Sequence, residues 1–256
     1  MKILCLGDVV GPAGAKHLCK NLWEFRKREG VSFVVANCEN ADEGNGLSSS
    51  SAKLLIERGV DVITTGNHVW RKNDLRPLLD SSDSVIRPLN YPPSCPGKGY
   101  TLCYADGYRI LVMNVMGTVY MDSLACPFHS VDSALKKNEG RYDIAVLDIH
   151  AEATSEKMAL GYYLDGRVNI IAGTHTHVQT ADERVLPKGS GYITDLGMCG
   201  STEGVLGVEK DIIIGRLRTK MPARHIYATE NPVAFGAIFT FDTDKKRVTE
   251  VKRVRF

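Results

Sequence analysis

The sequence lacks the long apolar segments and the one-sided charge that mark membrane proteins and polyanion-binding proteins. No apolar run approaches the roughly 20 residues that a membrane-spanning helix needs. The 32 lysine and arginine residues nearly balance the 30 aspartate and glutamate residues, and the formal net charge is +2. Because this balance gives no strong field for nucleic acid or a membrane surface, it favours a small anionic substrate over a polyanion.

The chain also lacks any C-x-x-C pair. Its seven cysteines are scattered, whereas a disulfide framework is typical of short secreted chains. The first residues, MKILCLGDVVG, have neither the long apolar region nor the small-residue cleavage site of a signal peptide, and they predict a first strand instead. We therefore expect reduced thiols that mostly pack as small apolar groups, and a cytoplasmic location.

No internal repeat, linker or low-complexity tract divides the 256 residues, so we expect a single domain over residues 1–256. Short apolar runs alternate with helical patterns. The expected strands are Ile3–Leu6, Phe33–Ala36, Val62–Thr65, Ile144–Ile149 and Val168–Ala172. The expected helices are Lys16–Arg28, Ser49–Arg58 and Ser155–Leu164. This alternation predicts an α/β domain with a largely parallel or mixed central sheet.

Two stretches predict antiparallel pairs. The turn Asp106-Gly107 separates Tyr100–Tyr104 from Arg109–Val115, which is a hairpin signal. Near the C-terminus, the polar residues 242–246 separate Ala234–Phe241 from Val248–Phe256. The proline-rich segment 87–97 is expected to be a connecting loop.

Five apolar strands end in residues that can bind metal. The segments are Ile3–Asp8 (ILCLGD), Phe33–Asn40 (FVVANCEN), Val62–His68 (VITTGNH), Ile144–His150 (IAVLDIH) and Val168–His177 (VNIIAGTHTH). In open α/β sheets, ligands bind outside the carboxyl ends of the strands. These five ends are therefore expected to converge on one place.

Each of these side chains also has an ordinary structural interpretation. Asp8 could be a turn or helix-cap residue, Glu39 could begin a solvated loop, and His150 could be a buried histidine with one hydrogen bond. Their coincidence at five strand ends favours a metal site instead. The predicted ligands are Asp8, Glu39, Asn40, Asn67, His150, His175 and His177.

This set of ligands also limits the metal. Carboxylates mixed with histidines and amide oxygens suit Fe, Mn or Zn, whereas calcium requires more oxygens. No thiolate is needed, so Cys38 is expected to pack inward. Seven groups are too many for one tetrahedral ion, and two ions bridged by one carboxylate would use them all.

The order of these residues resembles that of the calcineurin-like metallophosphoesterase superfamily, and more closely that of its YmdB-type branch. The stretches that carry the resemblance are LGDVVG, NCENA, TTGNHVW, DIHAEATSEK and AGTHTHVQTADERVLPKGSGYITDLGMCGS, which run nearly from end to end. The resemblance implies a four-layer αββα sandwich of mixed sheets and a phosphodiesterase acting on small substrates, 2′,3′-cyclic nucleotides among them. It also implies self-association as a homo-oligomer.

Three positions depart from the broad superfamily pattern. The usual D-x-H opening is Asp8-Val9-Val10, the usual bridging aspartate is represented by Glu39, and the usual GNH[DE] ends in Val69. Asn40 is the candidate that replaces the missing histidine. All three departures belong to the YmdB-like pattern.

The resulting hypothesis is a phosphodiesterase with two metal ions. Glu39 would bridge the ions; Asp8, Asn40 and His177 would complete one shell, and Asn67, His150 and His175 the other. Two ions about 4 Å apart can provide a hydroxide and hold phosphoryl oxygens. His68 would protonate the leaving alkoxide or stabilise its charge, unless it is a turn histidine bonded to the backbone.

Two other classes of protein are alternatives to this hypothesis. A metal-dependent regulator or scaffold with little turnover would keep the same ligands, and no sequence feature excludes it. A nucleotide-binding oxidoreductase is disfavoured, because the spacing of Gly7, Gly11 and Gly14 is not the G-x-G-x-x-G fingerprint. The loop at residues 42–46 either borders the substrate or only turns the chain. His17, His129 (in a loop) and His225 are expected to be structural, and Arg87 and Arg184 show no spacing that ties them to phosphate.

Overall fold

Short apolar strands assemble into two sheets in the computed structural model, which describes residues 1–256. The seven-stranded sheet has the order β2-β11-β12-β1-β3-β4, and β13 pairs with β12. Its strands are β1 (Lys2–Leu6), β2 (Asp8–Val9), β3 (Phe33–Asn37), β4 (Val62–Thr64), β11 (Met198–Ser201), β12 (Pro232–Asp242) and β13 (Arg247–Arg255). Strands β1, β3 and β4 are parallel, and β12 runs antiparallel to β1.

The six-stranded sheet has the order β5-β6-β7-β8-β10-β9. Its strands are β5 (Tyr100–Ala105), β6 (Tyr108–Met116), β7 (Ile144–His150), β8 (Ile170–Thr174), β9 (Arg184–Val185) and β10 (Gly191–Ile193). The hairpin predicted around Asp106-Gly107 joins β5 to β6, and β6, β7, β8 and β10 are parallel. The second predicted hairpin is the β12–β13 pair.

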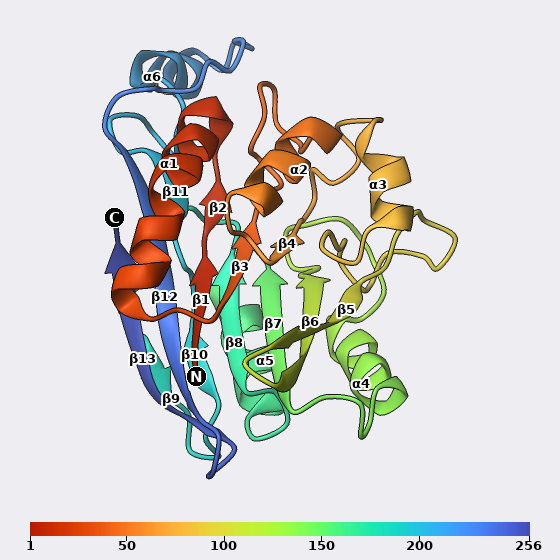
Figure 1. The fold of residues 1–256 in the computed structure, drawn as a ribbon. Coiled ribbons are helices and arrows are strands. Elements are labelled where there is room, and N and C mark those ends of the chain that lie inside the picture. The colour runs from red at the N-terminus through yellow and green to blue at the C-terminus, as the bar shows by residue number, and fades with distance from the viewer.

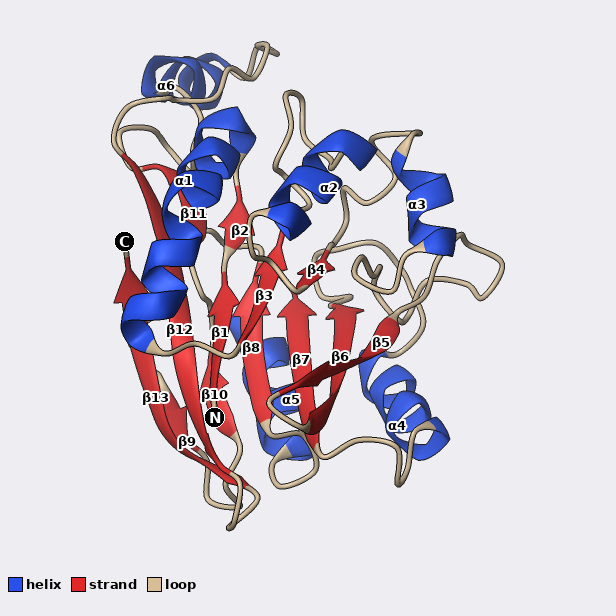
Figure 2. Cartoon of the chain, in the orientation of Figure 1, coloured by secondary structure: helices blue, strands red, loops and turns tan.

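Helices cover the outer face of each sheet (Figures 1 and 2). On the seven-stranded sheet they are α1 (Gly11–Glu29), α2 (Ser49–Glu57) and α3 (Leu75–Ser81), and on the six-stranded sheet α4 (Pro127–Lys137) and α5 (Thr154–Leu164). Helix α6 (Lys210–Thr219) buries no residue and stands apart from both sheets (Figure 1). Helix α1 buries Leu18, Leu22 and Phe25, and it ends at Gly30, whose φ of 67° suits glycine. Its first turn contains Pro12, which needs no helical N–H there. None of these helices is both long enough and apolar enough to cross a membrane.

The core is divided into layers by the alternation of side chains along each strand. Leu4 and Leu6 of β1 pack with the residues of α1 and α2, whereas Ile3 and Cys5 pack against the second sheet. A third cluster lies between the second sheet and helices α4 and α5. The predicted four-layer αββα sandwich of mixed sheets is confirmed, and the single central sheet that the residue pattern indicated is wrong. Strands β3, β4, β7 and β8 are buried along their whole length, so the residue pattern could not show which strands share a sheet.

Candidate metal centre

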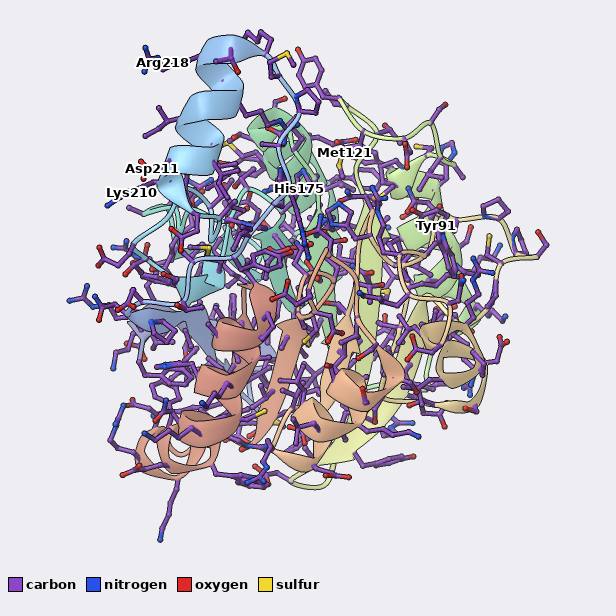
Figure 3. The ribbon with its side chains drawn as sticks, turned by 90° about the horizontal axis from the view of Figure 1, so that it is seen from above. Tyr91, Met121, His175, Lys210, Asp211 and Arg218 are labelled. Carbon is purple, nitrogen blue, oxygen red and sulfur yellow. The ribbon has the colours of Figure 1, made fainter.

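Five strand ends from both sheets meet at one edge of the sandwich. Strands β1, β3 and β4 of the first sheet approach this edge beside β7 and β8 of the second (Figure 1). The side chains that they carry there are Asp8, which opens β2, Glu39 and Asn40 after β3, Asn67 after β4, His150 at the end of β7, and His175 and His177 after β8. Seen from above, His175 lies near the middle of the molecule and α6 stands to one side (Figure 3).

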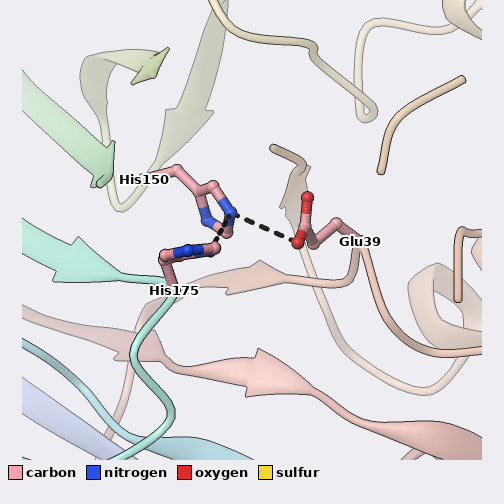
Figure 4. Close-up of side chains that lie close together, drawn as sticks. All are labelled: Glu39, His150 and His175. Carbon is pink, nitrogen blue, oxygen red and sulfur yellow. Dashed lines mark hydrogen bonds and ion pairs between the residues drawn. The ribbon is translucent and has the colours of Figure 1, made fainter. Parts of the chain in front are cut away.

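The first group of side chains surrounds His150 (Figure 4). Its Nε2 lies 3.2 Å from Glu39 Oε1, 3.1 Å from His175 Nδ1 and 3.0 Å from Asn67 Oδ1. Glu39, His150 and His175 each offer a ligand atom, and these three atoms lie within 4.8 Å of one another. A carboxylate, two imidazoles and an amide oxygen therefore face one small volume.

The second group contains Asp8, Asn40 and His177. The Nε2 atom of His177 lies 3.8 Å from Asp8 Oδ1 and 3.4 Å from Asn40 Nδ2. Glu39 Oε1 is 3.2 Å from the same Asn40 nitrogen, so Glu39 lies between the two groups. The amide of Asn40 directs its nitrogen toward this group and its oxygen toward His68, so ligation through oxygen requires a 180° turn of the amide.

One feature of the structure, separate from the types of residue present, indicates that these side chains fit metal ions. Asp8 Oδ1 is fully buried and has no hydrogen-bond partner. An unpartnered carboxylate oxygen in the interior is costly, and a bound cation removes that cost. The donor types, which are carboxylate, imidazole and amide, are those that bind borderline transition metals.

The pKa values of the charged side chains in the cluster are shifted by burial and by the charges of their neighbours. Burial raises the pKa of Asp8 to about 6. Burial also opposes the ionisation of Glu39, but the nearby His150 outweighs it and holds the pKa of Glu39 well below its usual value. Burial would lower the pKa of His150, yet Glu39 and Asp8 raise it to about 9. For His175, burial and the charge of His150 lower the pKa to about 3. The proton on His150 offsets the carboxylate charge that a bound cation would otherwise offset.

The orientation of His150 is fixed by groups that sequence reasoning missed. Its Nδ1 lies 2.9 Å from Thr174 Oγ1, and the Thr174 hydroxyl donates to Asp148 Oδ1 at 2.7 Å. Asp148 is buried and also accepts from the hydroxyl of Thr64. With Nδ1 engaged in this chain, Nε2 of His150 is left to face Glu39. Asp148 stands two residues before His150 in a buried strand, a position that could have indicated this role.

The loop that carries the last two histidines has an unusual backbone. His175 and His177 have φ values of 96° and 63°, which residues other than glycine rarely adopt. Between them, the backbone N–H and hydroxyl of Thr176 donate to Asp195 Oδ2 at 3.1 and 2.6 Å. Asp195 is buried with Lys157, whose Nζ lies 2.7 Å away. This buried ion pair therefore holds the loop in place, and it was not predicted.

Position 66, which precedes Asn67, has room only for glycine, because any side chain there would clash with neighbouring residues. A Cβ atom at Gly66 would lie 2.2 Å from His150 Cδ2 and 2.4 Å from Glu39 Oε2. The glycine lets the chain after β4 pass directly against two of the predicted ligands.

His68 lies beside the predicted ligands. Its Nδ1 is 2.8 Å from Asn40 Oδ1 and 3.1 Å from Glu39 Oε1, and its Nε2 is 3.4 Å from Asn45 Nδ2. The ring thus contacts side chains of the site and not backbone groups, which differs from the alternative of an ordinary turn histidine. Its backbone N–H donates to Glu39 Oε2 at 2.9 Å.

A cavity of about 340 Å³ opens next to His68, His175 and His177. Its other wall is largely apolar and consists of Val10, Val205, Leu206, Val208, Ile213 and Tyr227. Asn45 and His225 also line it, so the loop at residues 42–46 borders the cavity, and the interpretation of His225 as purely structural misses its place there. Glu152, which sequence reasoning also missed, lines the cavity and lies 3.2 Å from His175 Nε2.

Three side chains singled out in the sequence lie elsewhere. Arg87 is buried and donates to the backbone carbonyls of the proline-rich segment, so it does not face the site. His129 lies in α4 and not in a loop. Cys38 packs in the core between the first sheet and its helices.

The comparison with known sequences decides the family. A family described as "YmdB-like protein" matches residues 4–254. This chain belongs to the YmdB-like family. The 2′,3′-cyclic-nucleotide 2′-phosphodiesterase of Bacillus subtilis (strain 168) is 39% identical over 254 residues, which cover 99% of this chain and 96% of that protein.

Solved structures agree with this assignment. The crystal structure of a novel phosphatase from Mycoplasma pneumoniae superposes with a TM-score of 0.93 at 34% identity, covering 100% of this chain and 93% of that chain. The NAD nucleotidase of Haemophilus influenzae has a TM-score of 0.54 at 12% identity and covers 100% of this chain and 55% of its own, which shows a shared fold alone. This YmdB-like protein therefore has a calcineurin-like fold, and the prediction that it is an enzyme of the metal-dependent phosphoesterase class is confirmed.

Proposed function

We propose that this YmdB-like protein hydrolyses small phosphodiesters, 2′,3′-cyclic nucleotides among them, at a centre of two metal ions. One observation carries the proposal: side chains from five strand ends meet around a buried, unpartnered carboxylate oxygen of Asp8, beside a cavity. The name of the Bacillus subtilis relative supports the choice of substrate.

The two groups of side chains correspond to two ion sites. Asp8, Asn40 and His177 would hold one ion, and Asn67, His150 and His175 the other. Glu39, which contacts members of both groups, would be shared. Iron, manganese and zinc suit these donors. When bound, such ions lower the pKa of water to supply a nucleophile and neutralise charge on the phosphoryl oxygens.

His68 would assist the leaving group. Two acceptors, Asn40 Oδ1 and Glu39 Oε1, face its Nδ1, so Nδ1 carries a hydrogen and Nε2 is turned toward the cavity. As the bond from phosphorus to the leaving oxygen breaks, the Nε2–H proton passes to that oxygen, which leaves as an alcohol. The neutral ring then regains a proton from solvent. General acid catalysis of this kind contributes about 10²- to 10⁴-fold.

The apolar wall would contact the part of the substrate that carries no charge. A volume of about 340 Å³ is at the small end of the range of about 300–1,000 Å³ for small-molecule sites. Val208 and Leu206 lie on this wall, so a nucleoside would place its base or ribose against them.

The proposal is tested by elemental analysis of the purified protein together with a panel of phosphodiesters, 2′,3′-cyclic AMP and bis(p-nitrophenyl) phosphate included. We expect about two transition-metal ions per chain and hydrolysis that Asn67→Ala abolishes. Two bound ions without turnover of any ester would contradict the proposal and favour the regulator or scaffold. Light scattering on the same preparation tests the homo-oligomer that the resemblance implies.

A further inference from the structure

The contacts of His68 are unequal on the two sides of its ring. Nδ1 has two acceptors at 2.8 and 3.1 Å, whereas Nε2 has a single neighbour, Asn45 Nδ2, at 3.4 Å. Asn45 is therefore the side chain that restrains the Nε2 edge of the ring, which would face the leaving group, whereas Asn40 and Glu39 restrain the opposite edge.

Asn45 is itself held by a side chain that is distant in the sequence. The hydroxyl of Tyr227 donates to Asn45 Oδ1 in a short hydrogen bond, and this leaves the amide nitrogen facing His68. Tyr227 is 7% exposed and packs with Val10, Met198 and Val208. Gly11 lies directly against its ring, where a Cβ atom would come within 2.8 Å. The packed tyrosine therefore helps to fix the position of the Asn45 side-chain amide.

The backbone at Asn45 also helps to fix the position of its side chain. Its φ of 64° lies in the left-handed region, which asparagine tolerates better than most residues. The turn is closed by a hydrogen bond from the Asp42 N–H to the Gly46 carbonyl at 3.2 Å, and the Asp42 carboxylate accepts from the Ser51 hydroxyl at 2.6 Å. The loop is therefore anchored to the start of α2, and it presents the amide of Asn45 to the cavity.

We propose that Asn45 and Tyr227 are positioning residues that hold the His68 ring with Nε2 facing the leaving oxygen. The inference rests on the proposed function. A hydroxyl can donate or accept and an amide can turn, so the pair can give Nε2 a partner whether or not that nitrogen carries its proton. A displacement of a catalytic group by about 1 Å can cost about 100-fold in rate.

Dependence on the leaving group separates this role from a structural one. The alkoxide that leaves a 2′,3′-cyclic nucleotide is strongly basic and needs a proton, whereas p-nitrophenolate leaves readily without one. Loss of correct positioning at His68 therefore slows the first substrate much more than the second.

The experiment uses Asn45→Gly and Tyr227→Phe in the full-length, metal-loaded protein. Glycine removes the amide and accepts the positive φ of position 45, and phenylalanine removes only the hydroxyl. Tyr104→Phe is the matched control, because Tyr104 is 77% exposed and distant from the cavity. Each change is also made in the His68→Ala background, and metal content is measured for every variant.

We expect Asn45→Gly to lower kcat for 2′,3′-cyclic AMP by about 10- to 100-fold, with a smaller loss for Tyr227→Phe, little loss on bis(p-nitrophenyl) phosphate and no further loss in the His68→Ala background. Equal losses on both substrates, or additive losses with His68→Ala, would overturn the inference while leaving the proposed function intact. Absence of turnover in the wild-type protein would instead remove the proposed function.

Discussion

Replacing Gly66 by alanine adds one methyl group between two predicted metal ligands. The new Cβ atom would lie 2.2 Å from His150 Cδ2 and 2.4 Å from Glu39 Oε2. Ordinary contact begins near 3.4 Å, so the imidazole must move by about 1.2 Å, which is the difference between the two distances. The backbone at Gly66 does not have a positive φ, so the alanine introduces no strain of that kind.

Neither neighbour can move freely. His150 is held through Thr174, and Glu39 accepts from the backbone N–H of His68. We expect a loss of about 1–3 kcal/mol in the free energy of unfolding from overpacking. A displacement of about 1 Å at the reacting centre lowers kcat by about 100-fold, and metal content should fall below that of the wild type.

Elemental analysis, steady-state turnover and chemical denaturation measure these three effects. The matched control is Gly215→Ala in α6, where no atom lies within 4 Å of the added Cβ. This control should keep its metal and its activity, and it should gain about 0.5–1 kcal/mol from helix propensity. A Gly66→Ala protein with wild-type metal content and wild-type kcat would refute the reasoning, because the two side chains would then have room that the structure does not show.

Three further changes test separate parts of the site. His68→Ala should lower kcat by about 10²- to 10⁴-fold with metal content unchanged; loss of metal would instead place His68 among the ligands. Glu39→Ala should release at least one ion, and an unchanged metal content by elemental analysis would remove it as the shared ligand. Lys157→Met leaves the Asp195 carboxylate buried without its cation and should cost about 3–5 kcal/mol in urea denaturation. Stability equal to that of the wild type would show that Asp195 does not need this partner.

The strands were predictable because they are short apolar runs bounded by polar residues. The strand expected at Phe33–Ala36 is Phe33–Asn37 in the structure. Helix α1 begins at Gly11, earlier than the predicted Lys16, because its first turns carry glycines in place of a periodic apolar face. Gly14 lies there against the carbonyl of Cys199, where a side chain has no room. Close packing between distant segments thus hid the start of the helix.

The residue types at the site could be predicted because each one lies at the end of an apolar strand. Their supports could not, because they come from distant segments with no local pattern. Asn45 and Tyr227 are 182 residues apart, and Lys157 reaches Asp195 from a different element. Side-chain orientation was equally hidden: the sequence names Asn40, but only the structure shows its amide oxygen turned toward His68.

The division of the site between two sheets has a consequence for biogenesis. All seven predicted ligands lie within the first 177 residues, yet β1 is completed on one side by β12, which spans Pro232–Asp242. A chain emerging from the ribosome therefore carries every donor before the sheet that aligns four of them can close. We expect metal capture to follow release of the finished polypeptide, and a fragment that ends before β12 to hold its ions weakly.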